Sequence, residues 1–199
     1  AEPAQTPPAP AARAAAPLGD APSPRRPNVY EPGQGSLVLD DPLTSDRGTW
    51  VNPGLGDGTC LIAADGLHVT GASFYECFGG VPVVDFTFEV TFRFATGASA
   101  GLCFRQSDAA NRYTAQLGRD GSVALFGPVT MFVTGSGPTS GDGAVHTLAV
   151  VAVGTSFRFY VDRQLVASGS DDRLASGRVG MFADGGEIVF RDARVWQAA

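Results

Sequence analysis

The chain has 199 residues and a formal net charge of −6, and all fourteen of its basic residues are arginine. No basic stripe could neutralise nucleic-acid phosphates, and no apolar run approaches the roughly 20 residues of a membrane-spanning helix, so we expect no nucleic-acid partner and no transmembrane segment. Glycine (26), proline (14) and phenylalanine (13) are abundant, and no stretch shows the 3.6-residue repeat of a long helix, which favours an all-β protein rich in turns.

Residues 1–35 hold nine prolines and nine alanines and almost nothing to bury, which predicts an extended Pro/Ala-rich arm ahead of one domain at residues 36–199. Two interpretations stay open. The arm is a flexible spacer to a membrane anchor or neighbouring domain, or it docks on a partner protein through Arg25, Arg26, Val29 and Tyr30.

The clearest element is the strand from Phe86 to Phe94, in which every even position is apolar and every odd position is polar. A period of two predicts a half-buried strand with a core face and a polar face. We expect four consecutive antiparallel strands between Val83 and Gly127, forming one meander that is half of a sandwich.

Two later strands complete the expected domain. The segment from His146 to Val153 is apolar on both faces, which predicts a central strand. The last strand, from Glu187 to Trp196, is expected to pair beside the first one near Ser36, so that both ends of the domain are tied together.

Several of these features together resemble a known superfamily. The opening strand ends in Asp40-Asp41, Trp50 follows, and the paired cysteines precede Gly101-Leu102-Cys103-Phe104-Arg105. Residues 36–197 are similar to the concanavalin A-like lectin/glucanase superfamily, in particular to its laminin-G-like and DUF1080 or "family 16"-type bacterial sandwiches. The resemblance implies an antiparallel jelly-roll β-sandwich outside the cytoplasm, but it leaves the activity open because this fold hosts lectins, hydrolases and inert spacers.

The resemblance also implies a disulfide between Cys60 and Cys77, which would close a loop of about 18 residues and contribute about 3 kcal/mol. Cys103 lies where a strand needs an apolar residue, so we expect a buried free thiol, and no CxxC motif indicates zinc. The disulfide and the Ala-Glu-Pro start predict an extracytoplasmic protein (periplasmic, cell-surface or secreted) after removal of a signal peptide.

No motif for catalysis is present. The Glu-x-Asp-x-x-Glu motif of the related hydrolases and the Gly-x-Ser-x-Gly elbow are both missing, and Glu89 has Arg93 as its expected partner. We therefore predict no enzymatic activity and no cofactor, with a glycoside hydrolase as the weaker alternative. Calcium is the metal that the resemblance implies, and the weak candidate ligands are Asp171 and Asp172, with Asp40, Asp41, Asp46 and Asp184 as further acidic residues.

Sugar binding would need an aromatic platform beside polar groups on the concave sheet, and the candidate residues are Arg105, Tyr113, Gln116, Arg158 and Tyr160. The main hypothesis is a non-catalytic accessory subunit that docks, through its arm and the sandwich surface, on a larger extracytoplasmic or membrane protein assembly. The alternative is a lectin-like or sensor ectodomain that recognises a glycan.

Overall fold

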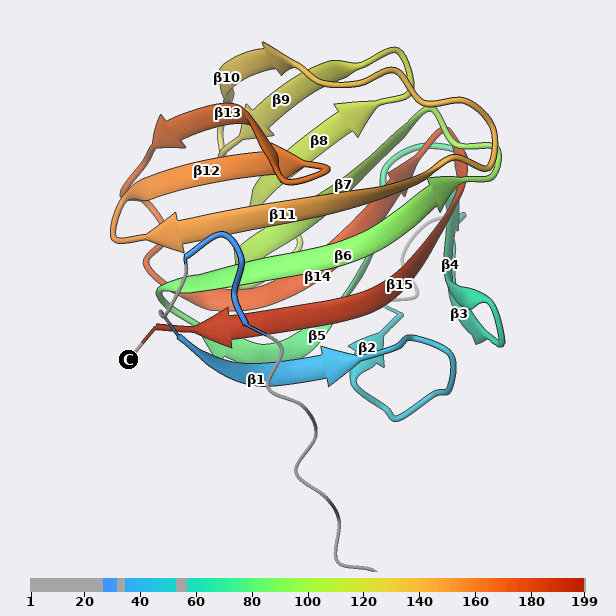
Figure 1. The fold of residues 1–199 in the computed structure, drawn as a ribbon, viewed down its shortest axis with the longest axis horizontal. Helices are drawn as coiled ribbons and strands as arrows, with labels where there is room; N and C mark the ends of the chain where they lie inside the picture. Colours follow the sequence, from blue (N-terminus) through green and yellow to red (C-terminus); the bar gives the residue numbers. More distant parts are fainter. Residues whose placement is uncertain (1–26, 32–34, 53–56, 199) are drawn as a thin grey trace, which may run out of the picture.

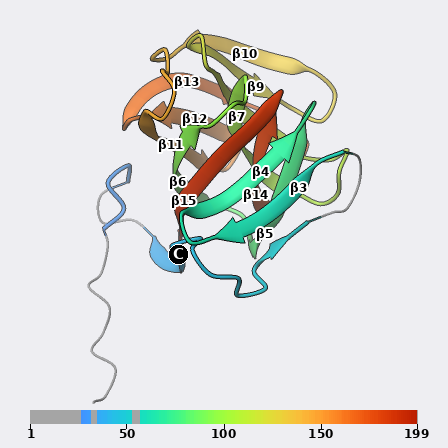
Figure 2. The same ribbon diagram turned by 90° about the vertical axis from the view of Figure 1, so that its right-hand side faces the viewer.

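A computed structural model describes residues 27–31, 35–52 and 57–198, and all regular structure in these residues is β-strand. Two antiparallel sheets pack face to face (Figures 1 and 2), which confirms the predicted jelly-roll sandwich. Within these ranges no helix is long and apolar enough to span a bilayer.

Eight strands form the first sheet, which we call sheet A. Their spatial order is β13 (Gln164–Ser170), β12 (Ser156–Val161), β11 (Val145–Val153), β6 (Phe86–Phe94), β15 (Gly186–Gln197), β4 (Gly66–Gly71) and β3 (Thr59–Ala63), with β1 (Ser36–Asp41) beside the C-terminal half of β15. The pairing of Ser36 with Gln197 joins the first and last strands as predicted. β11 lies between β6 and β12, as expected for a strand that is apolar on both faces.

Seven strands form the second sheet, which we call sheet B. Their spatial order is β10 (Met131–Ser136), β9 (Ser122–Phe126), β8 (Tyr113–Gly118), β7 (Ser99–Gln106), β14 (Gly177–Asp184), β5 (Tyr75–Val83) and β2 (Trp50–Val51). The meander of sheet B therefore runs through β7, β8, β9 and β10.

The strand β6 alternates as predicted, with its even positions buried in the core and its odd positions on the outer face of sheet A. The prediction that β6 begins the meander is wrong, because β6 pairs with β11 and β15, and the chain then crosses to sheet B. The crossing has a physical reason. The phenylalanines of β6 need an opposing apolar layer, and Phe86 packs against Phe104 of β7 with ring centroids 6.2 Å apart.

The cysteines behave as expected. Cys60 on β3 and Cys77 on β5 form a disulfide with their Cα atoms 6.0 Å apart, so the bond links sheet A to sheet B. Cys103 on β7 is a buried free thiol.

Candidate functional site

Two of the predicted sugar-binding residues, Arg105 and Tyr113, lie in the core instead of in an open cleft, so this prediction is wrong. Arg105 is 2% exposed and donates hydrogen bonds to the backbone carbonyls of Val84 and Leu174. Its φ of 48° breaks the alternation of β7 and turns the side chain inward. Tyr113 is fully buried, and its hydroxyl donates to Asp171.

The other three candidates lie on different faces, so the five residues do not converge. Gln116 lies on the outer face of sheet B, whereas Arg158 and Tyr160 lie on the outer face of sheet A because β12 belongs to that sheet. The separation of Tyr113 from Gln116 was readable in the sequence. Two residues three apart on one strand face opposite sides.

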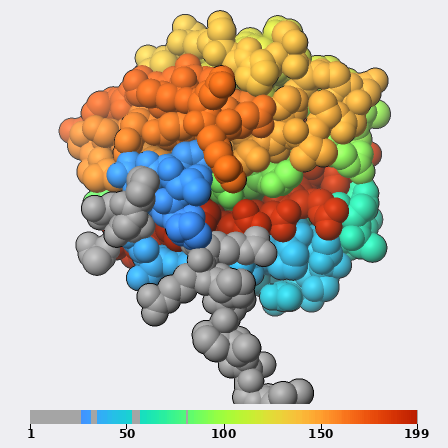
Figure 3. All heavy atoms as spheres, in the orientation of Figure 1, coloured from blue at the N-terminus to red at the C-terminus, as the bar shows by residue number. Residues whose placement is uncertain are grey.

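Arg158 and Tyr160 instead contact the residues just before the domain. We call residues 27–31 the anchor segment, which lies over the outer face of sheet A (blue in Figure 3). The Tyr30 hydroxyl donates to Glu89 at 2.8 Å, the Tyr30 ring lies 5.0 Å from that of Tyr160, and Glu31 forms an ion pair with Arg158. Tyr30, a predicted partner-docking residue, thus contacts Tyr160, a predicted glycan-binding residue, within the same chain.

The anchor segment is also held by Asn28. Its side-chain amide donates to the Thr87 hydroxyl at 2.9 Å, while its carbonyl oxygen accepts from the backbone amides of Tyr30 and Glu31. Val29 is 45% exposed, and Arg25 and Arg26 lie outside the described residues. Of the proposed docking residues, Tyr30 is therefore engaged by the chain's own sandwich.

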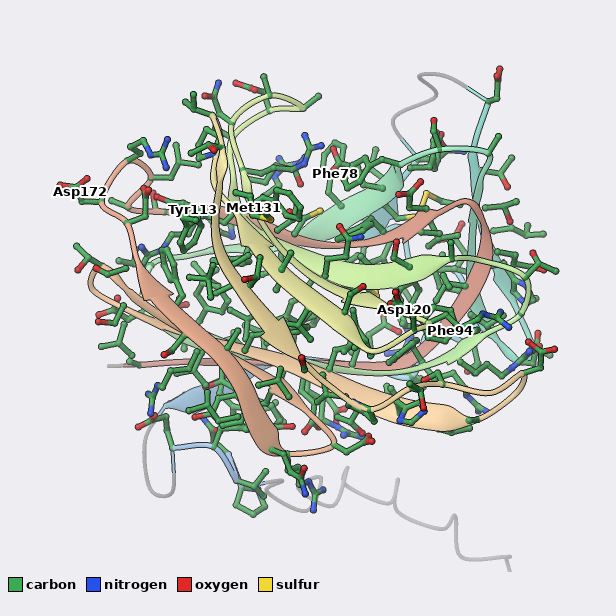
Figure 4. All side chains as sticks on the ribbon, turned by 90° about the horizontal axis from the view of Figure 1, so that it is seen from above. Phe78, Phe94, Tyr113, Asp120, Met131 and Asp172 are labelled. Carbon is green, nitrogen blue, oxygen red and sulfur yellow. A yellow bond between two sulfur atoms is a disulfide. The ribbon has the colours of Figure 1, made fainter. Side chains whose placement is uncertain are left out.

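The outer face of sheet B carries a different cluster, which the sequence analysis missed. Phe74 directly precedes β5, and Glu76 and Phe78 lie on it, so these three side chains occupy alternate positions on the outer face. Tyr75 and Cys77, between them, point into the core. The guanidinium of Arg112 lies 4.5 Å from the centroid of the Phe74 ring, and that of Arg178 lies 5.9 Å from the centroid of the Phe78 ring. Figure 4 shows Phe78 and the anchor segment on opposite sides of the sandwich.

Glu76 is the centre of this cluster and is only 6% exposed. Its Oε1 accepts from the Gln106 amide at 2.7 Å, and its Oε2 accepts from the Cys103 thiol at 3.2 Å. The same Oε2 lies 3.2 Å from Nε of Arg112. Burial, and then the charge of Glu76, raise the pKa of the Cys103 thiol well above its usual range, so the thiol is neutral and is not a nucleophile.

A glycine lies within the cluster. Gly180 of β14 lies between Phe78 of β5 and Cys103 of β7 in the sheet, and Phe182 is the residue of β14 that pairs with Glu76. A Cβ at position 180 would come within 2.8 Å of the Cys77 carbonyl oxygen. A larger residue would therefore clash with the backbone of β5.

A hollow of about 270 Å³ lies beside this cluster. Aromatic, polar and small residues line it: Phe74, Ala109, Ala110, Arg112, Thr114, Gln116, Phe126, Gly127 and Pro128. Phe74 is 36% exposed, which leaves one part of its ring to solvent. Oε1 of Gln106 is buried without a hydrogen-bond partner among the described residues, whereas Nε of Arg112 is buried in its ion pair with Glu76.

A second hollow of about 530 Å³ continues along β8 towards Arg119, Asp120 and Ser122. Gln116 lines both hollows, and its amide donates to the Ser99 hydroxyl at 2.9 Å. The two hollows together form a continuous polar and aromatic surface, which we call the sheet B face.

Among the calcium candidates, Asp171 has its carboxylate engaged by the protein. Hydrogen bonds from Arg173 and Tyr113 hold its pKa well below the usual range against the opposing effect of partial burial. Asp172 is exposed. In the ranges that the structure describes, no three acidic, histidine or cysteine side chains gather as a metal site would require, and calcium binding stays a prediction.

Comparison with known proteins identifies the fold. No protein-family profile matches the chain. No curated protein sequence matches it either. Solved structures do match, and these include the carbohydrate-binding module CBM66 from Bacillus subtilis (21% identity, 75% of this chain and 96% of that one, TM-score 0.67).

Two further matches are a Bacillus subtilis protein of unknown function with a galectin-like fold (16% identity, 83% and 98% coverage, TM-score 0.66) and a Bacillus licheniformis β-glucanase (13% identity, 83% and 99% coverage, TM-score 0.62). At these identities the likeness defines the fold alone. The chain has the galectin-like, concanavalin A-like β-sandwich fold that its sequence resembles.

Proposed function

We propose that this protein is a non-catalytic carbohydrate-binding module that holds its glycan on the sheet B face. The observation that carries the proposal is the hollow beside Phe74, where exposed aromatic surface meets the hydrogen-bonding groups of Arg112, Thr114 and Gln116. Ligand sites typically combine apolar surface with a few fixed polar groups, which set the orientation of the ligand. An aromatic ring covers the apolar C–H surface of a sugar, while its hydroxyls bond to the polar side chains.

The unpaired polar atoms beside the hollow support this proposal. Arg112 lines the hollow, and its terminal nitrogens donate no hydrogen bond to any described residue, so they are available to a hydrogen-bonding molecule there, whereas its Nε is paired with Glu76. The similar solved structures agree with a glycan as ligand, because one is named a carbohydrate-binding module and another a β-glucanase.

The absence of catalysis is part of the proposal. Glycoside hydrolysis needs two carboxyl groups on either side of the scissile bond. Among the described residues that line the two hollows, Asp120 is the single carboxylate, and both oxygens of nearby Glu76 are already engaged. We therefore propose that the sheet B face binds a sugar without cleaving it.

The disulfide supports an oxidising, extracytoplasmic location, where polysaccharides are accessible. The hypothesis of a protein assembly as partner stays a prediction for the arm. The contacts of the anchor segment favour a role within the chain for Tyr30 and Glu31.

Affinity electrophoresis and calorimetry against a panel of soluble polysaccharides test the proposal. We expect at least one polysaccharide to bind, and Phe74→Ala and Gln116→Ala each to weaken binding about tenfold through loss of stacking or of a hydrogen bond. Leu165→Ala is the matched control, because Leu165 is a 55% exposed hydrophobic residue on β13 of sheet A. Binding that is insensitive to Phe74 and Gln116, or no binding by any member of the panel, would contradict the proposal.

A further inference from the structure

We infer that the glycan on the sheet B face is a linear chain laid along β8, and that Asp120 holds the sugars at the end of the face remote from Phe74. The inference rests on the proposed function and adds the length and shape of the ligand to it. Its basis is the way in which the two hollows follow one strand.

The two hollows lie at opposite ends of β8. Arg112, just before this strand, lines the hollow of about 270 Å³, which we call the first hollow, and Arg119, just after the strand, lines the second. Gln116 lies between them on the outer face of β8 and lines both hollows. From Arg112 to Arg119, at about 3.3 Å per residue, the chain advances by about 23 Å. The combined surface is therefore several times longer than one sugar ring.

The two hollows differ in chemistry. Two aromatic side chains, Phe74 and Phe126, line the first hollow beside hydrogen-bonding groups. The second hollow is lined, among the described residues, by polar side chains and by small ones, without an aromatic ring: Ala98, Ser99, Gln116, Gly118, Arg119, Asp120 and Ser122. This combination fits a chain whose first sugar makes apolar contacts and whose following sugars are held by hydrogen bonds.

Asp120 is the fixed acceptor of the second hollow. Its Oδ1 accepts from the Ser122 hydroxyl at 2.6 Å and from the Ser122 backbone amide at 2.9 Å, and these bonds hold the pKa of Asp120 below its usual range. A Cβ at Gly118 would come within 2.5 Å of this Oδ1 and 2.3 Å of the Ser122 hydroxyl, so the glycine lets both groups lie over the end of β8. Ser122 engages Oδ1 alone, which leaves Oδ2 to accept from sugar hydroxyls.

Gln116 connects the two hollows. Its amide donates to the Ser99 hydroxyl at 2.9 Å, which fixes the side chain and leaves its carbonyl oxygen to accept from the sugar that crosses between the hollows. A linear glycan advances by about 5 Å per sugar, so about four sugars cover the length of about 23 Å along β8. A single sugar in the first hollow reaches Phe74 but not Asp120. We therefore assign the face to a linear chain and not to one sugar alone.

The test measures affinity as a function of ligand length. Calorimetry with the full chain uses the mono- to hexasaccharides that partial acid hydrolysis releases from each polysaccharide of the panel. For a polysaccharide that binds, we expect affinity to rise about tenfold or more from the disaccharide to the tetrasaccharide, because the longer ligand adds the hydrogen bonds of the second hollow. Beyond the tetrasaccharide the affinity should change little, because the face ends there.

Two variants assign the two ends of the ligand. Asp120→Asn keeps the shape of the side chain but removes one acceptor, and it should weaken tetrasaccharide binding about tenfold while disaccharide binding stays within about twofold of the wild type. Phe74→Ala should weaken binding of both lengths. Asp172→Asn is the control, because Asp172 is exposed, lines neither hollow and lies well apart from Asp120 (Figure 4). The midpoint of thermal unfolding checks that each variant is folded.

Three outcomes overturn the inference. If a mono- or disaccharide binds as tightly as the tetrasaccharide and Phe74→Ala weakens that binding, the proposed function stands but the ligand occupies the first hollow alone. If affinity rises with length and Asp120→Asn changes no length, or changes all lengths equally, the chain does not follow β8 from Phe74 to Asp120. If no polysaccharide or oligosaccharide binds, the inference fails together with the proposed function.

Discussion

The two outer faces of the sandwich are both organised around a buried glutamate, yet they are covered differently. On sheet A, Glu89 is 5% exposed and accepts from Arg194 at 3.0 Å and from the Tyr30 hydroxyl. On sheet B, Glu76 is 6% exposed and accepts from Gln106 and Cys103. Each carboxylate is thus removed from water and held by donors, as a buried charge requires.

The difference lies in where the covering groups come from. The anchor segment supplies the aromatic ring and the hydroxyl that cover Glu89, so this part of sheet A is occupied within the chain, while a hollow of about 210 Å³ remains beside it between Asn28 and Val151. On sheet B the aromatic rings and arginines border open hollows. A polar and aromatic face is therefore a binding candidate only where the same chain does not already fill it.

The largest expected effect comes from removing Glu89. Glu89→Ala leaves the Tyr30 hydroxyl without its acceptor and takes from the Arg194 guanidinium its most buried partner, while Asp40 and Asp192 remain beside it. Breaking a buried charge pair costs about 3–5 kcal/mol. Urea unfolding measures this loss. Thr91→Ala on the same face of β6 is the control and should change the free energy of unfolding by less than about 0.5 kcal/mol. A loss below about 1 kcal/mol for Glu89→Ala would show that the anchored face is not held by this carboxylate.

Removal of the disulfide should cost slightly less. Cys60→Ser with Cys77→Ser frees a loop of about 18 residues and releases β3 from β5, for a loss of about 3 kcal/mol. The double variant and the reduced wild-type protein should show the same lowered midpoint of unfolding. Because β5 carries Glu76, glycan affinity should also fall. Unchanged affinity in the folded variant would indicate that β5 is positioned by its strand pairing alone.

A smaller effect is expected at the anchor segment. Tyr30→Phe removes one hydrogen bond to Glu89 and should lower the free energy of unfolding by about 1 kcal/mol, whereas Tyr30→Ala also loses the contact with Tyr160 and should cost more. Glycan binding by both variants should equal that of the wild type, because Tyr30 lies on the opposite face. Tighter or weaker binding would mean that the two faces are coupled.

The smallest effect concerns pH and His68 on the outer face of sheet A. Partial burial disfavours the charged ring, but hydrogen bonds to Glu187 at 2.6 Å and Asp65 at 2.8 Å outweigh it and raise the pKa of His68. A raised pKa in the folded state gives stability that is complete below the unfolded pKa of about 6.5 and is lost as pH rises through the folded pKa.

Urea unfolding at about pH 6 and about pH 8.5 should therefore show lower stability of the wild type at the higher pH. His68→Gln should reduce this difference, because the glutamine does not titrate. A variant with the full pH dependence of the wild type would assign the effect to other groups.

Local patterns were enough to predict much of this fold. The alternation from Phe86 to Phe94 gave the strand and its buried face, because side chains alternate along any extended chain. The same alternation along β8 places Tyr113 and Gln116 on opposite faces of the sheet, although the predicted site put them together. The assignment of Arg105 to the surface failed for another reason, since its positive φ turns the side chain inward and no local pattern indicates it.

The sequence by itself determined an acidic, turn-rich, all-β sandwich with its strand faces and its lone buried thiol, because composition and a period of two are local properties. Only the tertiary structure decided which strands share a sheet, since that choice depends on pairing between segments far apart in the chain. It brought Glu76 within hydrogen-bond distance of Gln106, gave Glu89 the partner Arg194 instead of Arg93, and laid Tyr30 over Glu89.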